Sequence, residues 1–159
     1  MILHRVPIHD VSSLDDVAAF VSAAGGGRVV VFDADNTLVR QGAPLDEFGA
    51  AVNSAIDRFD ALIEVDRVIV LTNGPERGVS RMISRGNKPW TTRRRLALKK
   101  ATPIVVTGDQ ILTDGLLAWR LGATFLHLVV DEGNEAKSQA VMRRVGSVAA
   151  ALFFRRNEP

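Results

Sequence analysis

A wholly apolar run that ends in two aspartates constrains this chain more than any other feature. Residues 29–32 read Val-Val-Val-Phe, and Asp33 and Asp35 follow directly. Near-continuous apolar runs of this length are typical of strands that are buried on both faces of a parallel sheet. Carboxylates are scarce in protein cores, so a pair at the carboxyl end of such a strand predicts a chemical role. The ordinary structural alternative is a turn after the strand, because Asp and Asn are common in turns.

Two further apolar runs also have polar residues directly behind them. Residues 68–71 are followed by Thr72 and Asn73, and residues 104–106 lead into a loop that contains Asp109. Ligands of open parallel sheets bind in the crevice outside the carboxyl ends of the strands. We therefore expect the three strand ends to converge on one site.

The rest of the pattern alternates helices and strands, which predicts a doubly wound parallel α/β sheet with three α/β/α layers. Ser12 or Ser13, with two aspartates behind them, predicts the start of a helix that ends at the glycines 25–27. Apolar residues at helical spacing over 45–62 indicate the crossover helix between the first two strands. The remaining expected elements are a helix over 113–121, a last strand over 125–130 and a long final helix over 134–154.

The segment between residues 74 and 102 is expected to hold two short helices and a strong local charge. The whole chain has a formal net charge of only +2, but positions 77 to 100 hold nine basic residues and no acidic one. Arginines at every fourth position predict one stripe on a helix that begins at Pro75; they are Arg77, Arg81 and Arg85, opposite Val79, Met82 and Ile83. A solvated helix face explains such a stripe. A functional interpretation is a positive rim that attracts an anionic substrate or surface.

These motifs, in this order, resemble the haloacid-dehalogenase (HAD) superfamily of aspartate-nucleophile phosphatases. Residues 33–37 are similar to its first motif, Thr72 to its second, Lys88 to its third and residues 108–114 to its fourth. The residues at these motif positions are similar to those of the YqeG-type subfamily IIIA phosphatases, which are related to the mitochondrial phosphatidylglycerophosphate phosphatase. The resemblance covers about residues 7–130. It implies a HAD-like Rossmannoid fold, with the usual third strand reduced to 87–90.

The residue types suit phosphoryl transfer on chemical grounds as well. Asp33 is the candidate nucleophile, which forms an aspartyl phosphate, and Asp35 is the candidate general acid and base. We expect Thr72 to donate its hydroxyl to a phosphoryl oxygen. Lys88 would hold both Asp33 and the phosphate through its compact positive charge.

The remaining binding residues have alternatives that stay open at the level of sequence. The amides of Asn73 and Gly74 are expected to open the helix at Pro75 and to form an anion site there, with Thr37 as a further substrate-binding candidate. Thr72 and Asn73 also suit helix capping, which is compatible with phosphate binding. Two other basic residues compete with Lys88 for its role, namely Arg85 and Lys99.

Magnesium is the expected cofactor, because it prefers oxygen ligands and retains several waters. The side chains of Asp33 and Asp109 are candidate ligands, and the resemblance implies the backbone carbonyl of Asp35 as a third. Asp114 is either a further ligand through water or a residue that orients the other ligands. Since Asp114 falls near the start of a predicted helix, the preference for acidic residues at helix N-termini also explains it.

Length and composition fit a single capless domain over residues 1–159. The chain has a common domain size, and the intervals 39–66 and 74–102 leave no room for a cap that closes the site. The absence of cysteine excludes a disulfide framework and a thiolate zinc site. Residues 1–10 do not resemble a signal peptide, and the longest apolar run, 148–154, is too short to span a bilayer. We expect a cytoplasmic protein, with that run as a candidate oligomer interface.

The sequence thus predicts a magnesium-dependent phosphomonoester hydrolase that works through an aspartyl phosphate. The expected partner is a phosphorylated small molecule or a lipid headgroup such as phosphatidylglycerophosphate, with peripheral contact to an anionic membrane surface; nucleic acid is not expected. One alternative is a receiver-like phospho-acceptor signalling domain, whose adjacent acidic pair does not match the Asp-x-Asp spacing here. Another is a weakly catalytic module that binds anionic lipid or RNA, which has no need of both Asp33 and Asp35.

Overall fold

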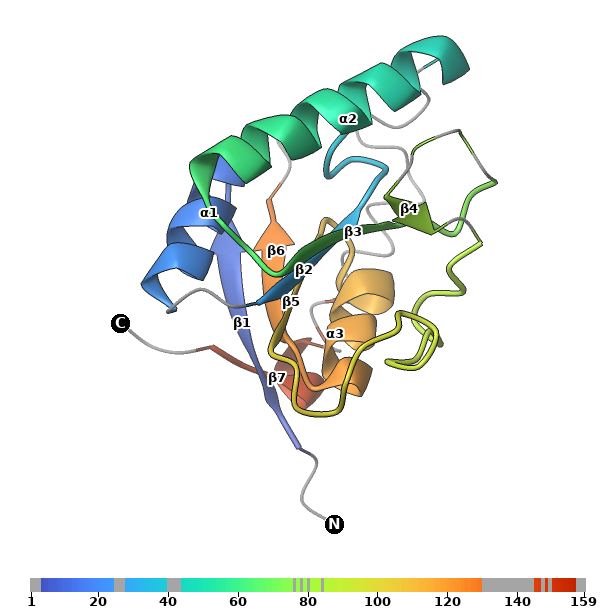
Figure 1. The fold of residues 1–159 in the computed structure, drawn as a ribbon. Coiled ribbons are helices and arrows are strands. Elements are labelled where there is room, and N and C mark those ends of the chain that lie inside the picture. The colour runs from blue at the N-terminus through green and yellow to red at the C-terminus, as the bar shows by residue number, and fades with distance from the viewer. Residues whose placement is uncertain are drawn as a thin grey trace.

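The computed structural model describes residues 4–24, 28–39, 44–75, 77, 79, 81–83, 85–129, 145–146, 148 and 150–156. Its strands form one seven-stranded sheet in the order β4-β3-β2-β5-β6-β1-β7, and every neighbouring pair is parallel (Figure 1). The strands are β1 (Val6–Val11), β2 (Val29–Asp33), β3 (Arg67–Leu71), β4 (Met82–Ile83), β5 (Ile104–Gly108), β6 (Thr124–Leu128) and β7 (Phe154–Arg156). The labelled helices are α1 (Leu14–Ala23), α2 (Leu45–Leu62) and α3 (Leu116–Leu121), and a π-helical turn, η1 (Ile111–Gly115), precedes α3.

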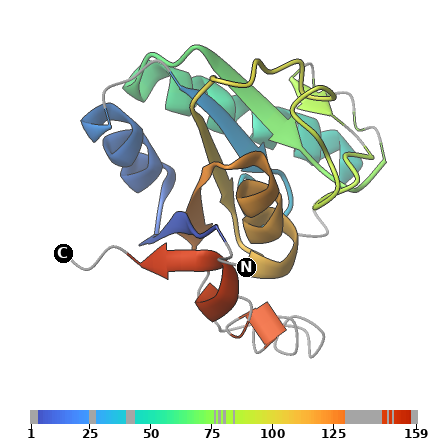
Figure 2. The ribbon, with the colours of Figure 1, turned by 90° about the horizontal axis from the view of Figure 1, so that it is seen from below.

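Helices cover both faces of the sheet, which confirms the predicted α/β architecture (Figures 1 and 2). On one face α1 and α2 pack through Val21 and Phe48 against a core that includes Phe32 of β2. On the other face α3 packs through Leu117 against a core that includes Phe125 of β6. All five residues of β2 are buried, as expected for a strand with a layer on each side.

The sheet is doubly wound, and its winding reverses between β2 and β5. From β2 the chain moves outward through β3 to β4, and it then returns to β5 on the other side of β2. The helix that follows β2 lies on one face and the helix that follows β5 lies on the other. The crevice at the carboxyl ends of β2 and β5 is therefore a topological switch point, where ligands of such sheets bind.

The first two helices form where the sequence predicts them. The Ser13 hydroxyl caps α1 by accepting a hydrogen bond of 3.2 Å from the amide of Asp16. In α2 the apolar residues recur every three or four positions, and four of them are at most 3% exposed: Phe48, Val52, Ile56 and Phe59. That face packs on the sheet, so hydrophobic burial selects the predicted helix.

The helix expected to begin at Pro75 is a wrong prediction. Met82 and Ile83 form strand β4, which pairs with the last residues of β3, and the amide of Val70 donates to the carbonyl of Arg81 at 3.0 Å. Val79 packs into the core on the α2 face, whereas Ile83 packs against the core on the α3 face. A single helical stripe cannot serve both faces of a sheet, so the arginine periodicity was misleading.

The strand that follows β3 along the chain also lies elsewhere than predicted. It was expected at 87–90, but it is β4. Residues 87–90 form a turn in which the amide of Trp90 donates to the carbonyl of Asn87 at 2.6 Å. The described residues within 74–102 contain no helix, so the two expected short helices are wrong for that part of the chain. Hydrogen bonds to the edge of β3 stabilise an extended segment where local propensity favours a helix.

Sequence reasoning missed the two strands at the end of the sheet opposite β4. Strand β1 was not predicted, because Asp10 is exposed where the alternation of buried residues would continue. The predicted last strand is observed as β6, but β7 follows it at the sheet edge next to β1. Much of the predicted helix over 134–154 lies outside the described residues; described residues between 145 and 153 are helical, and Phe154 begins β7.

Arg93 has a structural role that its place in a basic run did not suggest. Its guanidinium donates to the carbonyls of Leu121 (3.0 and 2.7 Å), Lys99 (3.0 Å) and Thr102 (3.0 Å), and so ties its loop to the end of α3. We expect Arg93→Met to lower the free energy of unfolding by about 2 kcal/mol, because several charge-assisted hydrogen bonds are lost together. Urea denaturation measures this change, with Arg94→Met as the control on the exposed neighbour. Equal stability of the two variants would contradict the assignment.

Candidate functional site

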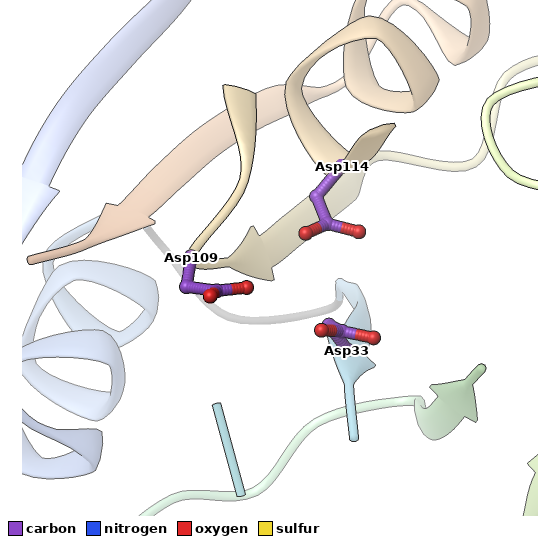
Figure 3. A group of neighbouring side chains, drawn as sticks. All are labelled: Asp33, Asp109 and Asp114. Carbon is purple, nitrogen blue, oxygen red and sulfur yellow. The ribbon is translucent and has the colours of Figure 1, made fainter. Parts of the chain in front are cut away.

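Three aspartates converge at the switch point of the sheet. Asp33 ends β2, Asp109 directly follows β5, and Asp114 lies in η1; Figure 3 shows their carboxylates turned toward one another. One carboxylate oxygen from each lies within 4.8 Å of the others. Asp33 and Asp114 are buried, and Asp109 is half-buried. Three carboxylates gathered out of solvent require a compensating positive charge.

Backbone geometry brings this cluster together. Alternation along β2 places Asp33 on the same face as Val29 and Val31, which belong to the α3-side core. The wide turn of η1 places Asp114 directly over Gly108 at the end of β5. A Cβ atom on Gly108 would lie only 2.3 Å from Oδ2 of Asp114. The glycine is therefore required for the close approach of Asp114 to the strand.

We expect Gly108→Ala to damage the cluster without unfolding the protein. The added methyl group must displace the Asp114 carboxylate, because contacts of 2.3 to 2.6 Å are too short for nonbonded atoms. Isothermal titration with Mg²⁺ should then show an affinity at least ~10-fold weaker, the order of loss seen when a group that orients a metal ligand is disturbed. Gly49→Ala in α2 is the matched control, since its Cβ would meet ordinary contacts of 3.7 Å or more. Undiminished Mg²⁺ affinity in Gly108→Ala would contradict the expected effect.

Lys88 reaches into the cluster from the turn after β4. Its ammonium group donates to Oδ1 of Asp33, and it donates to Oδ1 of Asp114 at 2.7 Å. Its side chain is only 6% exposed, whereas Arg85 and Lys99 are exposed residues. Of the three basic candidates considered from sequence, Lys88 is the one that contacts the aspartates.

Asn73 holds Lys88 in place through the backbone. Its side-chain oxygen accepts a hydrogen bond of 2.7 Å from the Lys88 amide, and its side-chain nitrogen donates to the Lys88 carbonyl at 3.3 Å. The strand end after β3 therefore fixes the turn that carries the lysine. Sequence reasoning assigned the backbone amide of Asn73 to the substrate, which stays a prediction, and it missed the contact of the Asn73 side chain with Lys88.

Burial and mutual repulsion shift the ionisation of the aspartates. Burial first, and the charge of Asp114 second, raise the pKa of Asp33 well above its usual range, against the opposing effect of Lys88. The same two causes raise the pKa of Asp109 to about 6. Burial acts to lower the pKa of Lys88, but the charges of Asp114 and Asp33 outweigh it and raise that pKa. Lys88 is therefore a permanent cation that does not fully neutralise its neighbours.

The donor set fits a divalent cation with oxygen ligands. When all three carboxylates are ionised, the ammonium of Lys88 leaves a formal charge of −2 on the cluster, which a divalent ion would balance. Oδ1 of Asp109 is buried and has no hydrogen-bond partner among the described residues. A buried carboxylate oxygen without a donor is costly, so it is suited to a cation. Asp33, Asp109 and Asp114 are the residues that would hold the ion.

Asp35 lies apart from this cluster and has its own partners. Its Oδ1 accepts a hydrogen bond of 3.0 Å from the guanidinium of Arg77, and its Oδ2 accepts one of 3.3 Å from the hydroxyl of Thr72. Its side chain is thus not among the acidic groups that gather around Asp33. Sequence reasoning placed Arg77 on an outer helix stripe and missed this contact, because the described residues around Arg77 are not helical.

Asn36 is a second residue of the site that sequence reasoning missed. Its side chain donates to Oδ2 of Asp109 at 3.2 Å, and its backbone adopts a left-handed conformation with φ 61°. Asn tolerates that conformation better than most residues. The signal was present in the sequence as Asp-Asn directly after a buried strand, but it was interpreted only as a turn.

The other two substrate-binding candidates from the sequence are Gly74 and Thr37. The amide of Gly74 donates to the hydroxyl of Thr72 at 3.0 Å, and the described residues around it do not begin a helix. The predicted anion site at a helix N-terminus is therefore wrong for those residues. Thr37 is buried beside the loop, and its hydroxyl has no hydrogen-bond partner among the described residues.

Most arginines of the basic segment are engaged within the molecule. Arg81 pairs with Asp60 at 2.5 Å, and Arg95 donates to the carbonyl of Arg85 at 2.7 Å. Arg77 and Arg93 have the contacts described above. A positive rim would therefore depend on the exposed residues that remain, which include Arg94, Lys99 and Lys100.

A pocket of about 730 Å³ lies beside β3 and is lined by residues from the end of α2, from β3 and from the segment that holds β4. Its lining mixes acidic, basic and apolar residues, among them Glu64 and Arg67. Arg67 donates to the carbonyl of Leu96 at 3.0 Å, and Arg81 pairs with Asp60. Both arginines of the lining therefore have partners within the molecule, whereas the aspartate cluster has a buried carboxylate oxygen without a partner among the described residues.

Neither the search for membrane spans nor the comparisons added a functional assignment. In the part of the chain that the structure describes, no helix combines the length and apolar content needed to cross a bilayer. Comparisons with protein-family models, with curated proteins and with solved structures found no match to this chain. The function of this protein is therefore inferred from the geometry of its site.

Proposed function

We propose that this protein is a magnesium-dependent phosphomonoester hydrolase that works through an aspartyl phosphate on Asp33. The observation that carries the proposal is the convergence of Asp33, Asp109 and Asp114 at the switch point of the sheet, where Lys88 contacts Asp33 and Asp114. Phosphoryl transfer needs a nucleophile in a fixed position and positive charge around the transferred group. This cluster offers both within a few ångströms.

The residues at the site supply the groups needed for both steps, phosphorylation of Asp33 and hydrolysis of the aspartyl phosphate. A carboxylate oxygen of Asp33 attacks phosphorus, the ester P–O bond breaks, and the leaving oxygen takes a proton from Asp35. Asp35, now a carboxylate, removes a proton from water, whose oxygen attacks phosphorus and releases phosphate and the Asp33 carboxylate. Lys88 and Thr72 would hold the equatorial oxygens of the transferred group. The magnesium ion would neutralise oxygen charge and keep Asp33 ionised.

The proposal extends to fold and substrate. The strand ends and the resemblance of the motifs support a HAD-like domain over residues 1–159 without a cap, so that the crevice opens to solvent. The substrate class is a phosphomonoester, either a soluble molecule or a lipid headgroup such as phosphatidylglycerophosphate. The internal pairing of the arginines favours a soluble substrate, because fewer basic side chains remain to hold an anionic membrane surface.

A panel of phosphomonoesters, assayed with and without Mg²⁺, tests this function. We expect Mg²⁺-dependent release of phosphate from at least one member and a covalent phosphoenzyme trapped on Asp33 after rapid acid quench. A phosphoenzyme that forms but is not hydrolysed would favour the receiver-like alternative. No turnover and no phosphoenzyme with any member would overturn the proposal.

Asp35→Asn should separate proton donation from nucleophilic attack. A nitrophenolate leaves without protonation, so phosphorylation of Asp33 by p-nitrophenyl phosphate should slow much less than phosphorylation by an alkyl phosphate. We expect the alkyl substrate to lose roughly 10² to 10⁴ in rate, which is the usual contribution of general acid catalysis. Single-turnover kinetics with both substrates measure the difference. Equal losses on both would show that Asp35 acts on geometry and not on the leaving group.

A further inference from the structure

Arg77 lies beside Asp35, the candidate acid of the proposed reaction. Its Nη1 lies 3.0 Å from Oδ1 of Asp35, and its guanidinium stacks 4.3 Å above the ring of Phe48. Phe48 is fully buried in α2, so it forms a rigid platform for the guanidinium. The Arg77 side chain is 18% exposed, so part of it remains accessible from outside.

The ion pair with Asp35 uses only part of what the Arg77 guanidinium can bind. Arg77 is a permanent cation, and its planar group can hold two anions at once. A partly buried cation beside the candidate acid is therefore suited to a second anion.

The guanidinium has donors available for a second partner. Arginine has five N–H groups, and the structure records one hydrogen bond from Arg77, the one to Asp35. Its Nε is buried and has no hydrogen-bond partner among the described residues. The Nη2 atom lies above Gly74, where an added Cβ would come within 3.2 Å of it. Gly74 therefore leaves space for Arg77 beside the strand end after β3.

We propose that Arg77 selects phosphomonoesters whose leaving group carries a second anion, a carboxylate or another phosphate, close to the scissile bond. The second anion accepts hydrogen bonds from the guanidinium donors that Asp35 does not use. This inference depends on the proposed function and names the substrate class of that same site.

Matched substrates and variants test the selection. The substrates are 2-phosphoglycolate and 2-hydroxyethyl phosphate, which differ in one carboxylate, with ethane-1,2-diyl bisphosphate to distinguish a carboxylate from a phosphate as the second anion. The variants are Arg77→Gln and Arg77→Lys. Arg81→Gln is the control, because Arg81 lies in the same segment and pairs with Asp60 outside the site.

We expect the wild-type protein to favour one of the anionic substrates over 2-hydroxyethyl phosphate by roughly 10- to 100-fold in kcat/KM, as one charge-assisted pair allows. Arg77→Gln should bring that ratio close to one through a rise in KM for the anionic substrate. Arg77→Lys should restore part of the ratio, and Arg81→Gln should leave it unchanged. A structural role for Arg77 would instead lower turnover of all three substrates by the same factor.

Two different failures can be told apart. If the wild-type protein hydrolyses these substrates with equal efficiency, the inference about Arg77 is wrong and the proposed function stands. The inference is also wrong if Arg77→Gln keeps the wild-type ratio. If no phosphomonoester is hydrolysed in the presence of Mg²⁺, the proposed function itself fails. The wild-type ratio decides the question even if the Arg77 variants do not fold.

Discussion

Asp33→Asn should reduce phosphomonoester turnover by at least ~10³-fold, which corresponds to ~4 kcal/mol of activation free energy. An amide cannot attack phosphorus as a carboxylate does, so the aspartyl phosphate, which is a mixed anhydride, does not form. The fold should survive, because Lys88 keeps its hydrogen bond to Asp114 and the amide has the shape of the carboxylate. Steady-state kinetics with the best substrate of the panel measure the effect.

The control for this prediction is Asp60→Asn, which removes a carboxylate that pairs with Arg81 outside the site. Circular dichroism and thermal melts should show both variants folded. Only Asp33→Asn should lose turnover and the phosphoenzyme that acid quench traps. Near-normal turnover by Asp33→Asn would show that another residue is the nucleophile.

Removal of divalent cations should have an effect of similar size. We expect a chelator to abolish turnover and Mg²⁺ to restore it, because without a cation the Asp33 carboxyl tends to keep its proton and cannot attack. Ca²⁺ should not restore turnover, since its larger and looser shell would misplace the nucleophile. Asp109→Asn should raise the Mg²⁺ concentration needed for half-maximal activity. Full turnover in the presence of chelator would exclude this mechanism.

Cation binding should also change stability in a pH-dependent way. The pKa of Asp109 rises from 3.8 to about 6 in the folded state, so between these values the folded protein binds a proton that the unfolded chain has lost. Without metal, the contribution of Asp109 therefore makes the fold less stable as pH rises from about 4 to 6. Mg²⁺ should raise Tm more at pH 8 than at pH 5, because protons compete for Asp109 at the lower pH. Asp109→Asn should reduce this difference.

The parts of the fold with a strong apolar pattern could be predicted from sequence. The buried run of β2 and the apolar face of α2 are long and regular, and both elements form where expected. Strands β4 and β7 have two and three residues, which is too short for any periodicity to show. They exist because a neighbouring strand offers hydrogen bonds, and that information is nonlocal.

The same distinction between local pattern and nonlocal contacts applies to the residues of the candidate site. Asp33 and Asp109 stand at strand ends, so the topology of a parallel sheet was sufficient to bring them together. Arg77 and Asn73 act through loops whose paths depend on β4, and their partners Asp35 and Lys88 could not be inferred from spacing. The helix predicted to begin at Pro75 was wrong, and for that reason both contacts were missed.

Because of the hydrogen bonds between Asn73 and Lys88, the site also depends on the pairing of β4 with β3 at the edge of the sheet. Asn73 follows β3, Lys88 follows β4, and β4 is a strand of two residues that pairs with the last two residues of β3. A local opening that releases β4 would leave the aspartates on the inner strands but would withdraw their lysine. Hydrogen exchange at the Lys88 amide would then report the fraction of molecules competent for chemistry, independently of global unfolding.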